Sequence, residues 1–550
     1  MVPLTIDYEV ASRVPTRRSA ADVRADLLAR REIALLDVRE EAHHAEGHPL
    51  FAANLPLSRL EFEAYARIPR RTTAIVLLDN GEGLVTLAAE RLFALGYQNV
   101  ALLEDGLQGW RDAGYEIFRD VNSPSKAFGE LVEAQRQTPF LSAEEVKALI
   151  DTQADTVIVD ARRFDEFQTM SIPTATSVPG AELALRVRAL APRPETRVIV
   201  NCAGRTRSII GAQSLINAGL PNPVAALRNG TIGWKLAGQA LDHGQSRKFP
   251  EVDDTIRKTS AAAARRVADR AGVKRLDLGT TIHWIEHGSQ TIYRFDVRTP
   301  EEFISGHLPG FHNAPGGQLV QETDGFAPVR GARIVLVDDD GTRANMTASW
   351  LAQMAWDVFV IDSDVGEPDG WRARFTERGR GYIPLPVLPS LTDGAAISPS
   401  RLAEWLQPGS DSAVVVFDFA PSSIYAKSHI PGSWFALRSS LADALHAPAT
   451  AGRYVFTSPD GLAARFAWAD AHKFTTKPLH VLDGGTAAWT AQGGATDDGA
   501  PRYASPPIDR YKRPYEGTDS PAADMQAYLD WEYGLVEQLN RDGTHGFRVL

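Results

Sequence analysis

One pattern recurs four times along the chain and limits the kind of fold it can adopt. A short apolar segment that ends in aspartate occurs around Asp37, Asp160, Asp296 and Asp418, at intervals of 122 to 136 residues. Such intervals match the length of a compact domain and are far longer than the repeat unit of a solenoid. The chain is therefore expected to contain four consecutive copies of one domain.

Each copy continues with the same sequence of features. A second apolar segment leads into a helical pattern, and a third leads into a glycine-containing turn that ends in tryptophan. These closing tryptophans are Trp110, Trp234, Trp371 and Trp489. Strands that alternate with helices predict an α/β fold in which each copy forms a mainly parallel sheet flanked by helices.

The repeats predict four domains and a C-terminal extension. The expected domains cover residues 1–122, 138–244, 273–383 and 394–498, and the extension covers residues 499–550. The predicted linkers are residues 121–137, 244–272 and 381–397, and the second of them contains an Ala-rich helical pattern at 259–271. Ser520 and Pro521 predict the start of a helix that runs to about Leu539, and its aromatic residues are expected to dock on a domain.

Composition excludes several functional classes. The formal net charge is −11, from 58 Lys and Arg against 69 Asp and Glu, which argues against a general nucleic-acid binder. One cysteine in 550 residues allows no intrachain disulfide and no Cys-rich metal site. The sequence has no signal-peptide pattern and no apolar run near 18 residues, so we expect a cytoplasmic protein without a membrane span. No nucleotide-binding fingerprint or histidine metal spacing occurs, so no cofactor and no metal are expected.

The single cysteine lies where an anion would be stabilised. Val198–Val200 predict a buried strand, and the residues from Ser208 onwards predict a helix. Cys202 stands between the two, at a helix N-terminus and close to Arg205 and Arg207. Backbone N–H groups, the helix dipole and the two arginines all favour the thiolate, which is the nucleophilic form. A buried structural cysteine is the alternative.

This loop resembles the active-site loop of the rhodanese (sulfurtransferase) family, in which a catalytic cysteine is followed by four residues, an arginine and often serine or threonine. Here these are Cys202, Ala203–Thr206, Arg207 and Ser208. The Asp-x-Arg strand end, the Gly-His-x-Pro-Gly-like turn and the Trp-containing turn add to the resemblance, which covers residues 15–495. The second copy lacks the Gly-His pair, and the fourth has Ala420 in place of the arginine.

The resemblance implies which residues would carry the chemistry. Cys202 would be the nucleophile, and Ala203, Gly204, Arg205, Thr206, Arg207 and Ser208 would form the loop that binds the donor and stabilises a persulfide. Arg205 is expected to hold the anionic end of the donor, while Arg207 would either do the same or shape the loop. Trp234 would wall the pocket or pack in the core. Asp160 and Arg162 are expected to form a structural ion pair.

The other copies lack a nucleophile. They carry Asp79, Asp338 and Ser458 at the position of Cys202 and are expected to be inactive. The order of copies resembles a two-domain sulfurtransferase, inactive then active, followed by a second pair that would serve as scaffold, dimer surface or acceptor dock.

Several functions remain open on the sequence. The leading one is transfer of sulfane sulfur from thiosulfate or a similar anionic donor, through a Cys202 persulfide, to a thiol or cyanide. The alternatives are a persulfide carrier, a 3-mercaptopyruvate sulfurtransferase, and a non-catalytic scaffold or binding protein. A phosphatase or arsenate reductase is disfavoured because the related loops are one residue longer. The expected partners are a small sulfur donor and a thiol acceptor, with a homodimer or a protein acceptor also considered.

Overall fold

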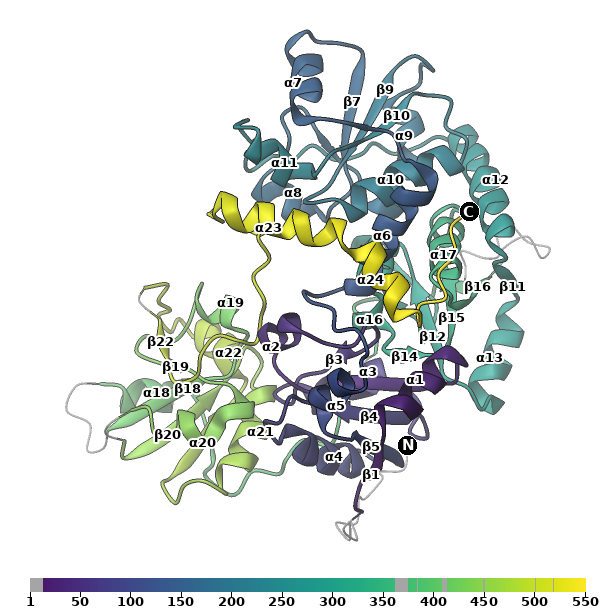
Figure 1. Ribbon diagram of the computed structural model, residues 1–550. Helices are drawn as coiled ribbons and strands as arrows, with labels where there is room; N and C mark the ends of the chain where they lie inside the picture. Colours follow the sequence, from purple (N-terminus) through teal and green to yellow (C-terminus); the bar gives the residue numbers. More distant parts are fainter. Residues whose placement is uncertain are drawn as a thin grey trace.

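Each sequence repeat forms its own sheet in the computed structural model (Figure 1). The structure describes residues 13–361, 374–382, 384–407, 413–448, 451–499, 501–517 and 519–550. Trp371, residues 1–12 of the first predicted domain and the predicted boundary at residue 383 lie outside these ranges. The fold class predicted from the sequence is confirmed.

The central strands are rich in Val, Ile and Leu because both faces of each sheet are covered. The first sheet has the order β1 (Thr16–Arg18), β5 (Asn99–Leu103), β4 (Ala74–Leu78), β2 (Ile33–Asp37) and β14 (Val329–Arg330), with β3 (Ala53–Asn54) also on β2. The second has the order β6 (Phe140–Leu141), β10 (Val224–Leu227), β9 (Arg197–Asn201), β7 (Thr156–Asp160) and β8 (Thr176–Ser177). The third has the order β11 (Lys274–Leu276), β16 (Asp357–Ile361), β15 (Arg333–Val337), β12 (Ile292–Asp296) and β13 (His312–Asn313). The fourth has the order β17 (Ala396–Ile397), β21 (Leu479–Leu482), β20 (Arg453–Thr457), β18 (Val414–Asp418), β19 (Trp434–Phe435) and β22 (Arg502–Tyr503).

Helices cover the sheets. Around the first sheet lie α1 (Ala20–Leu28), α2 (Glu41–Glu46), α3 (Leu60–Arg67), α4 (Leu84–Ala94) and α5 (Gly106–Asp112). Around the second lie α7 (Ala143–Asp151), α8 (Phe164–Thr169), η1 (Gly180–Glu182), α9 (Leu183–Leu190), α10 (Thr206–Asn217) and α11 (Gly230–Leu236). The third repeat has α13 (Leu278–His287), α14 (Pro300–Ser305), α15 (Gly316–Gln321), α16 (Thr323–Phe326) and α17 (Arg343–Gln353). The fourth has α18 (Pro399–Trp405), α19 (Ser422–Tyr425), η3 (Arg438–Ser440), α20 (Leu441–Ala444), α21 (Leu462–Ala471) and α22 (Gly485–Ala491).

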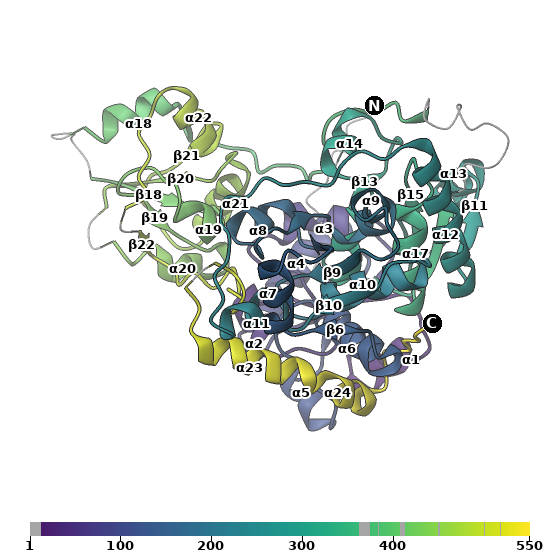
Figure 2. The ribbon, with the colours of Figure 1, turned by 90° about the horizontal axis from the view of Figure 1, so that it is seen from above.

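The repeats do not associate as two consecutive pairs, which corrects the sequence-based expectation. The first and third repeats share one hydrophobic core, and β14 from the third repeat runs antiparallel to β2 of the first. The fourth repeat instead contacts the first through buried ion pairs, such as Arg438 with Glu61 at 2.9 Å. Figure 2 shows this repeat projecting from the body that the other three form.

Two predicted linkers are helical. Residues of the second linker form α12 (Asp254–Ala271), as its Ala-rich pattern predicted, and α12 packs on α9 and α17. The first linker forms α6 (Ser123–Arg136), whose residues Ser123 to Val132 are all buried. A Cβ atom at Gly129 would lie 2.8 Å from Thr206 Cγ2, so glycine allows α6 to approach the Cys202 loop closely.

The C-terminal extension also packs close to the Cys202 loop. It forms α23 (Ala522–Tyr533) and α24 (Leu535–Asp542), with a break at Gly534 within the single helix expected from the sequence. Met525, Tyr528 and Leu529 of α23 pack with Ile232 of the second repeat. The yellow helices in Figure 1 cross from the second repeat towards the first and third. The predicted docking of this segment is confirmed.

Candidate active site

Cys202 lies at the carboxyl end of the central strand β9, directly before the helix α10. Its side chain is buried, with the residue 2 % exposed. The carbonyls of Cys202 and Ala203 accept hydrogen bonds from the N–H groups of Thr231 and Ile232, at 2.9 and 3.0 Å. A Cβ atom at Gly230 (φ +54°) would lie 2.3 Å from the Cys202 carbonyl oxygen, so this turn requires glycine. The Gly230 turn therefore binds carbonyl groups of the Cys202 loop on the outer side of the loop. The N–H groups of the Cys202 loop are left to face inward.

The corresponding loops of the other repeats show what this backbone binds. The N–H of Ala344 donates to Asp338 Oδ2 at 2.8 Å, and the N–H of Val85 donates to Asp79 Oδ2 at 3.3 Å. In the fourth repeat the N–H of Ala464 donates to Ser458 Oγ at 3.4 Å. The equivalent residue after Cys202 is Ser208. In two repeats a carboxylate thus occupies the space beside a helix N-terminus, which identifies the loop backbone as an anion cradle.

Arg207 is the cation that acts on Cys202. It opens α10 and forms a bidentate pair with Glu166 of α8, at 2.8 and 2.9 Å. Glu166 has its pKa lowered to about 2: the charge and hydrogen bonds of Arg207 outweigh burial, which acts in the opposite direction. Arg207 also lines a cavity of about 730 Å³ between the repeats and the C-terminal extension. The cationic residues lining this cavity are Arg59, Arg162, Arg163, Arg207, Lys427, Arg510 and Arg513.

The guanidinium of Arg205, which the sequence predicted to hold the donor, is bound to other residues of the protein. Its guanidinium is buried and donates to both carboxylate oxygens of Glu130 on α6, at 2.8 Å each. It also pairs with Glu133 and lies over the ring of Tyr533, 4.1 Å from the centroid. Because these partners already occupy the guanidinium, Arg205 fastens α6 and α23 to the loop. Arg207 replaces it as the candidate for binding an anionic donor.

The C-terminal helix α23 covers the loop from the other side. The Cβ position at Gly204 lies 3.3 Å from Glu532 Oε2 and 3.2 Å from Tyr528. Glu532 is buried; its Oε1 accepts a hydrogen bond from the Tyr528 hydroxyl at 2.9 Å, and its Oε2 has no hydrogen-bond partner among the described residues. Burial raises the pKa of Glu532 to about 7, although Lys126 and Tyr528 act against it. A protonatable carboxyl group therefore lies beside the cysteine loop.

The balance of these effects raises the pKa of Cys202. Burial is the largest cause, while Arg207 and hydrogen bonds from Ser208 lower the pKa and Glu532 raises it. The sequence predicted that the loop favours the thiolate. That prediction did not take into account the burial of Cys202 beneath α23 or the charge of Glu532. Burial of Cys202 therefore favours the thiol form, while Arg207 and Ser208 favour the thiolate.

The remaining predicted residues lie in or near the loop. Ala203 and Thr206 are buried, and the Ser208 hydroxyl donates to the carbonyl of Arg205 at 2.8 Å. Trp234 is fully buried in a core cluster, and its indole N–H donates to the Ala240 carbonyl at 2.7 Å. Of the two roles considered for Trp234, this position agrees with core packing. Asp160 and Arg162 form the expected buried ion pair at 2.7 Å.

Sequence reasoning missed three carboxylates of this site: Glu130, Glu166 and Glu532. Of the three, Glu166 is the one that a comparison of the repeats could have found, because Glu302 occupies the same position in the third repeat and pairs with Arg343. Glu130 and Glu532 lie outside the repeated pattern, in a predicted linker and in the C-terminal extension. No repeat comparison could have found them.

Within the described ranges, no group of three or more His, Cys, Asp or Glu side chains is arranged to hold a metal. None of the described helices combines the length and apolar character needed to cross a bilayer.

Four tandem α/β units, one with a cysteine in an anion-binding loop and three without, define a multidomain protein with a single thiol site. The chain belongs to the rhodanese family: the rhodanese-like domain model matches residues 19–113, 142–237, 283–366 and 398–492. It is similar to a thiosulfate sulfurtransferase from Pseudomonas aeruginosa, with 62 % identity, 97 % of this chain and 100 % of that chain covered, and a TM-score of 0.93.

Other solved structures match single repeats. A protein of unknown function from Rhodopseudomonas palustris, described as a possible tyrosine phosphatase, shares 29 % identity over 20 % of this chain and 91 % of its own, with a TM-score of 0.18. The BH2092 protein from Bacillus halodurans shares 19 % identity over 20 % of this chain and 81 % of its own, with a TM-score of 0.18. No curated protein matches the chain.

Proposed function

We propose that this protein is a sulfurtransferase that moves a sulfane sulfur from thiosulfate, or a similar anionic donor, to a thiol or cyanide through a persulfide on Cys202. The observation that carries the proposal is the loop itself. Backbone N–H groups that bind carboxylates in the first and third domains surround a cysteine in the second. The 62 % identity to a thiosulfate sulfurtransferase supports the same activity.

The chemistry follows from placing a sulfur anion in that cradle. The Cys202 thiolate attacks the outer sulfur of thiosulfate, the S–S bond of the donor breaks, and sulfite leaves with the electron pair. The resulting persulfide anion has one sulfur more than the thiolate and extends further into the loop. N–H groups of the loop and the N-terminus of α10 stabilise its charge. A second nucleophile then takes the outer sulfur and returns the Cys202 thiolate.

The donor is expected to approach from the cavity that Arg207 lines. Seven cationic and six acidic side chains line this cavity, so the expected contact for a dianion such as thiosulfate is Arg207 itself and not an overall positive charge. Glu166 fixes the Arg207 guanidinium in plane through two hydrogen bonds. Arg207 thus supplies a pre-oriented cation for the sulfonate end of the donor.

The other three domains serve a structural role in this proposal. Asp79 and Asp338 accept hydrogen bonds from their own loops, so no space is left there for a transferred sulfur. Ser458 lacks an adjacent arginine in its loop.

Intact-protein mass spectrometry after incubation with thiosulfate tests the proposal. The wild type should gain about 32 Da, one sulfur atom, and Cys202→Ala should gain nothing, because no other cysteine exists in the chain. Sulfite should appear in equal amount. If neither thiosulfate, 3-mercaptopyruvate nor glutathione persulfide produces the mass gain, the chain is not a sulfurtransferase.

A further inference from the structure

A second cavity lies far in sequence from Cys202, between the first domain, the third domain and the C-terminal residues. It has a volume of about 390 Å³ and is lined by Arg30 of the first domain, Lys274 and Arg330 of the third, and His545 and Arg548 near the C-terminus. One carboxylate, Asp357, also lines it. Asp357 is already used, because it accepts from Lys274 Nζ at 2.7 Å and lies 3.6 Å from Arg333 Nε.

Arg330 is held in this cavity without a carboxylate partner among the described residues. Its guanidinium is stacked between two aromatic rings, 4.1 Å from the centroid of Phe51 and 4.3 Å from that of Trp356. Among the described residues, the guanidinium of Arg330 makes one hydrogen bond, a long one of 3.5 Å to the Met354 carbonyl. The rings fix the plane of the guanidinium and leave the N–H groups at its edge to point elsewhere.

The charges around Arg330 are uncompensated. Burial and the nearby Arg30 lower the pKa of Arg330 to about 9, whereas a paired arginine such as Arg298 has its pKa raised by its aspartate. Trp356 adds an indole N–H that is buried and has no acceptor among the described residues. A half-buried cation beside a second cation is costly unless an anion joins them.

We infer that this cavity is a binding site for a small tetrahedral oxyanion of the sulfate or phosphate class. Such an anion would accept hydrogen bonds from Arg330 and neutralise the repulsion between Arg330 and Arg30. Arg30 and Arg548 are exposed at the rim, so the anion has a path from solvent. Because the site joins the first and third domains and the C-terminus, its occupation would stabilise their association. The inference is independent of the proposed sulfur transfer.

Isothermal titration calorimetry with sodium sulfate, and separately with sodium phosphate, tests the inference in Cys202→Ala protein against sodium chloride at matched ionic strength. We expect saturable binding of one anion per chain that requires Arg330, accompanied by a higher melting temperature. Arg330→Met, which keeps an apolar stem between the rings, should weaken binding about tenfold or more, and Arg30→Ala should weaken it to a smaller extent. Arg453→Met is the matched control, because Arg453 also stacks on a tryptophan, 4.3 Å from the Trp405 ring, but lies in the fourth domain.

Three results would overturn the inference. They are no difference between sulfate or phosphate and chloride, equal affinity in Arg30→Ala and the parent, or equal affinity in Arg330→Met and Arg453→Met. If Arg330→Met does not fold, the exposed residue Arg30 decides the question alone. Failure of the sulfur-transfer experiment would leave this result unaffected, because the titration uses a chain without cysteine. If sulfate and phosphate bind equally, the site recognises the charge and shape of the anion. If one of them binds more tightly, that anion represents the class of ligand.

Discussion

The loops of the second and third domains, residues 202–208 and 338–344, occupy the same place in the fold but differ in the group that the loop surrounds. In the third domain this group is a carboxyl group of the chain itself. Asp338 accepts N–H groups from Gly341 and Ala344 at 3.0 and 2.8 Å, and burial together with Asp340 raises its pKa well above the usual range. The second domain has an uncharged thiol at this point. Its loop therefore remains available for an anion that arrives with the substrate.

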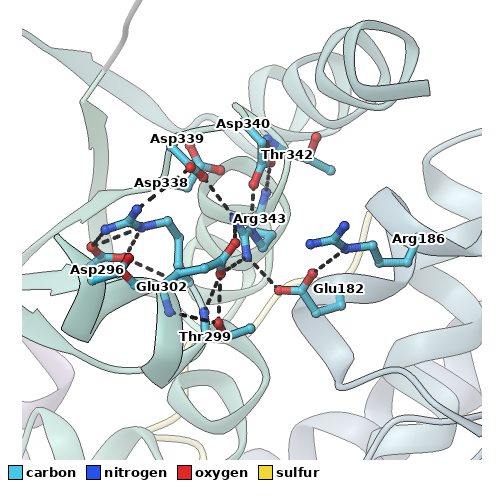
Figure 3. A network of polar contacts seen from close by, with 12 residues as sticks. Glu182, Arg186, Asp296, Thr299, Glu302, Asp338, Asp339, Asp340, Thr342 and Arg343 are labelled. Atoms are coloured by element: carbon cyan, nitrogen blue, oxygen red, sulfur yellow. Dashed lines mark hydrogen bonds and ion pairs between the residues drawn. The ribbon is translucent and has the colours of Figure 1, made fainter. Parts of the chain in front are cut away.

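The arginine at the end of each loop differs in the same way. Arg343 is 1 % exposed in its side chain and pairs with four carboxylates: Glu182, Glu302, Asp339 and Asp340 (Figure 3). One of them, Glu182, comes from the second domain, so Arg343 fastens the two domains together. Among the residues that the structure describes, Arg207 has one carboxylate partner, Glu166, and it faces a cavity. The arginine at this position of the repeat therefore packs two domains together in the third copy. In the second copy the equivalent arginine is open to a ligand.

The substitution Cys202→Asp should break the difference between the loops most completely. We expect sulfur transfer to fall by about 10⁴-fold or more, because a carboxylate holds no transferable sulfur. The fold should persist, because the loop N–H groups would bind the new carboxylate as they bind Asp338. Thiocyanate release from thiosulfate and cyanide measures the activity, and thermal melting measures the fold. Retained activity, or an unfolded protein, would contradict the equivalence of the two loops.

Matched substitutions of the two arginines should separate ligand binding from domain packing. Arg343→Gln leaves the buried Asp340 without a cation and removes the ion pair to Glu182 of the second domain, and it should lower the stability by about 3–5 kcal/mol. Arg207→Gln should have a small effect on stability, and kcat/KM for thiosulfate should fall about 100-fold. Steady-state kinetics and calorimetry on both variants decide this. If Arg343→Gln lost activity without losing stability, the assignment of roles would be wrong.

The repeats made much of this comparison predictable. Four strands ending at Asp37, Asp160, Asp296 and Asp418 predicted the four sheets, and the position of Cys202 at a strand end before a helix was correct. The direction of Arg205 was not predictable, because its partner Glu130 lies in a segment that the sequence marked only as a linker and that forms the helix α6 against α10 and α24. The pairing of the first with the third domain was not predictable either, because it uses a shared core and β14, a two-residue strand that no sequence pattern marks.

Glu532→Gln should shift the reactivity of Cys202 without changing its loop. The charge of Glu532 raises the pKa of Cys202, so its removal should lower that pKa. We expect alkylation by iodoacetamide at pH 8 to be several-fold faster than in the wild type. Below pH 7 the difference should shrink, because Glu532, with a pKa of about 7, is then largely uncharged in the wild type. Glu537→Gln, on the exposed face of α24, is the control and should alkylate at the wild-type rate.

The fourth domain extends the comparison to the strand-end aspartate. Arg39 pairs with Asp37 at 2.6 Å, and the pKa of Asp37 is lowered to about 2, since His44 and Arg39 outweigh burial. Asp418 has Ala420 in place of an arginine, and burial raises its pKa to about 6.

A raised pKa stabilises the folded state at low pH and not at high pH. The fourth domain should therefore lose up to ~3 kcal/mol of stability as the pH rises from about 4 through 6, because ionised Asp418 is buried without a cation. Asp37 acts in the opposite direction: its contribution is present above pH 4 and is lost as the pH falls towards 2. Asp418→Asn should accordingly raise the melting temperature at pH 7.5 and leave it unchanged at pH 4, and Asp37→Asn should lower it at pH 7.5. Calorimetry at the two pH values measures both variants. If Asp418→Asn is less stable than the wild type at pH 7.5, the charge of Asp418 is compensated in the folded state and this prediction is wrong.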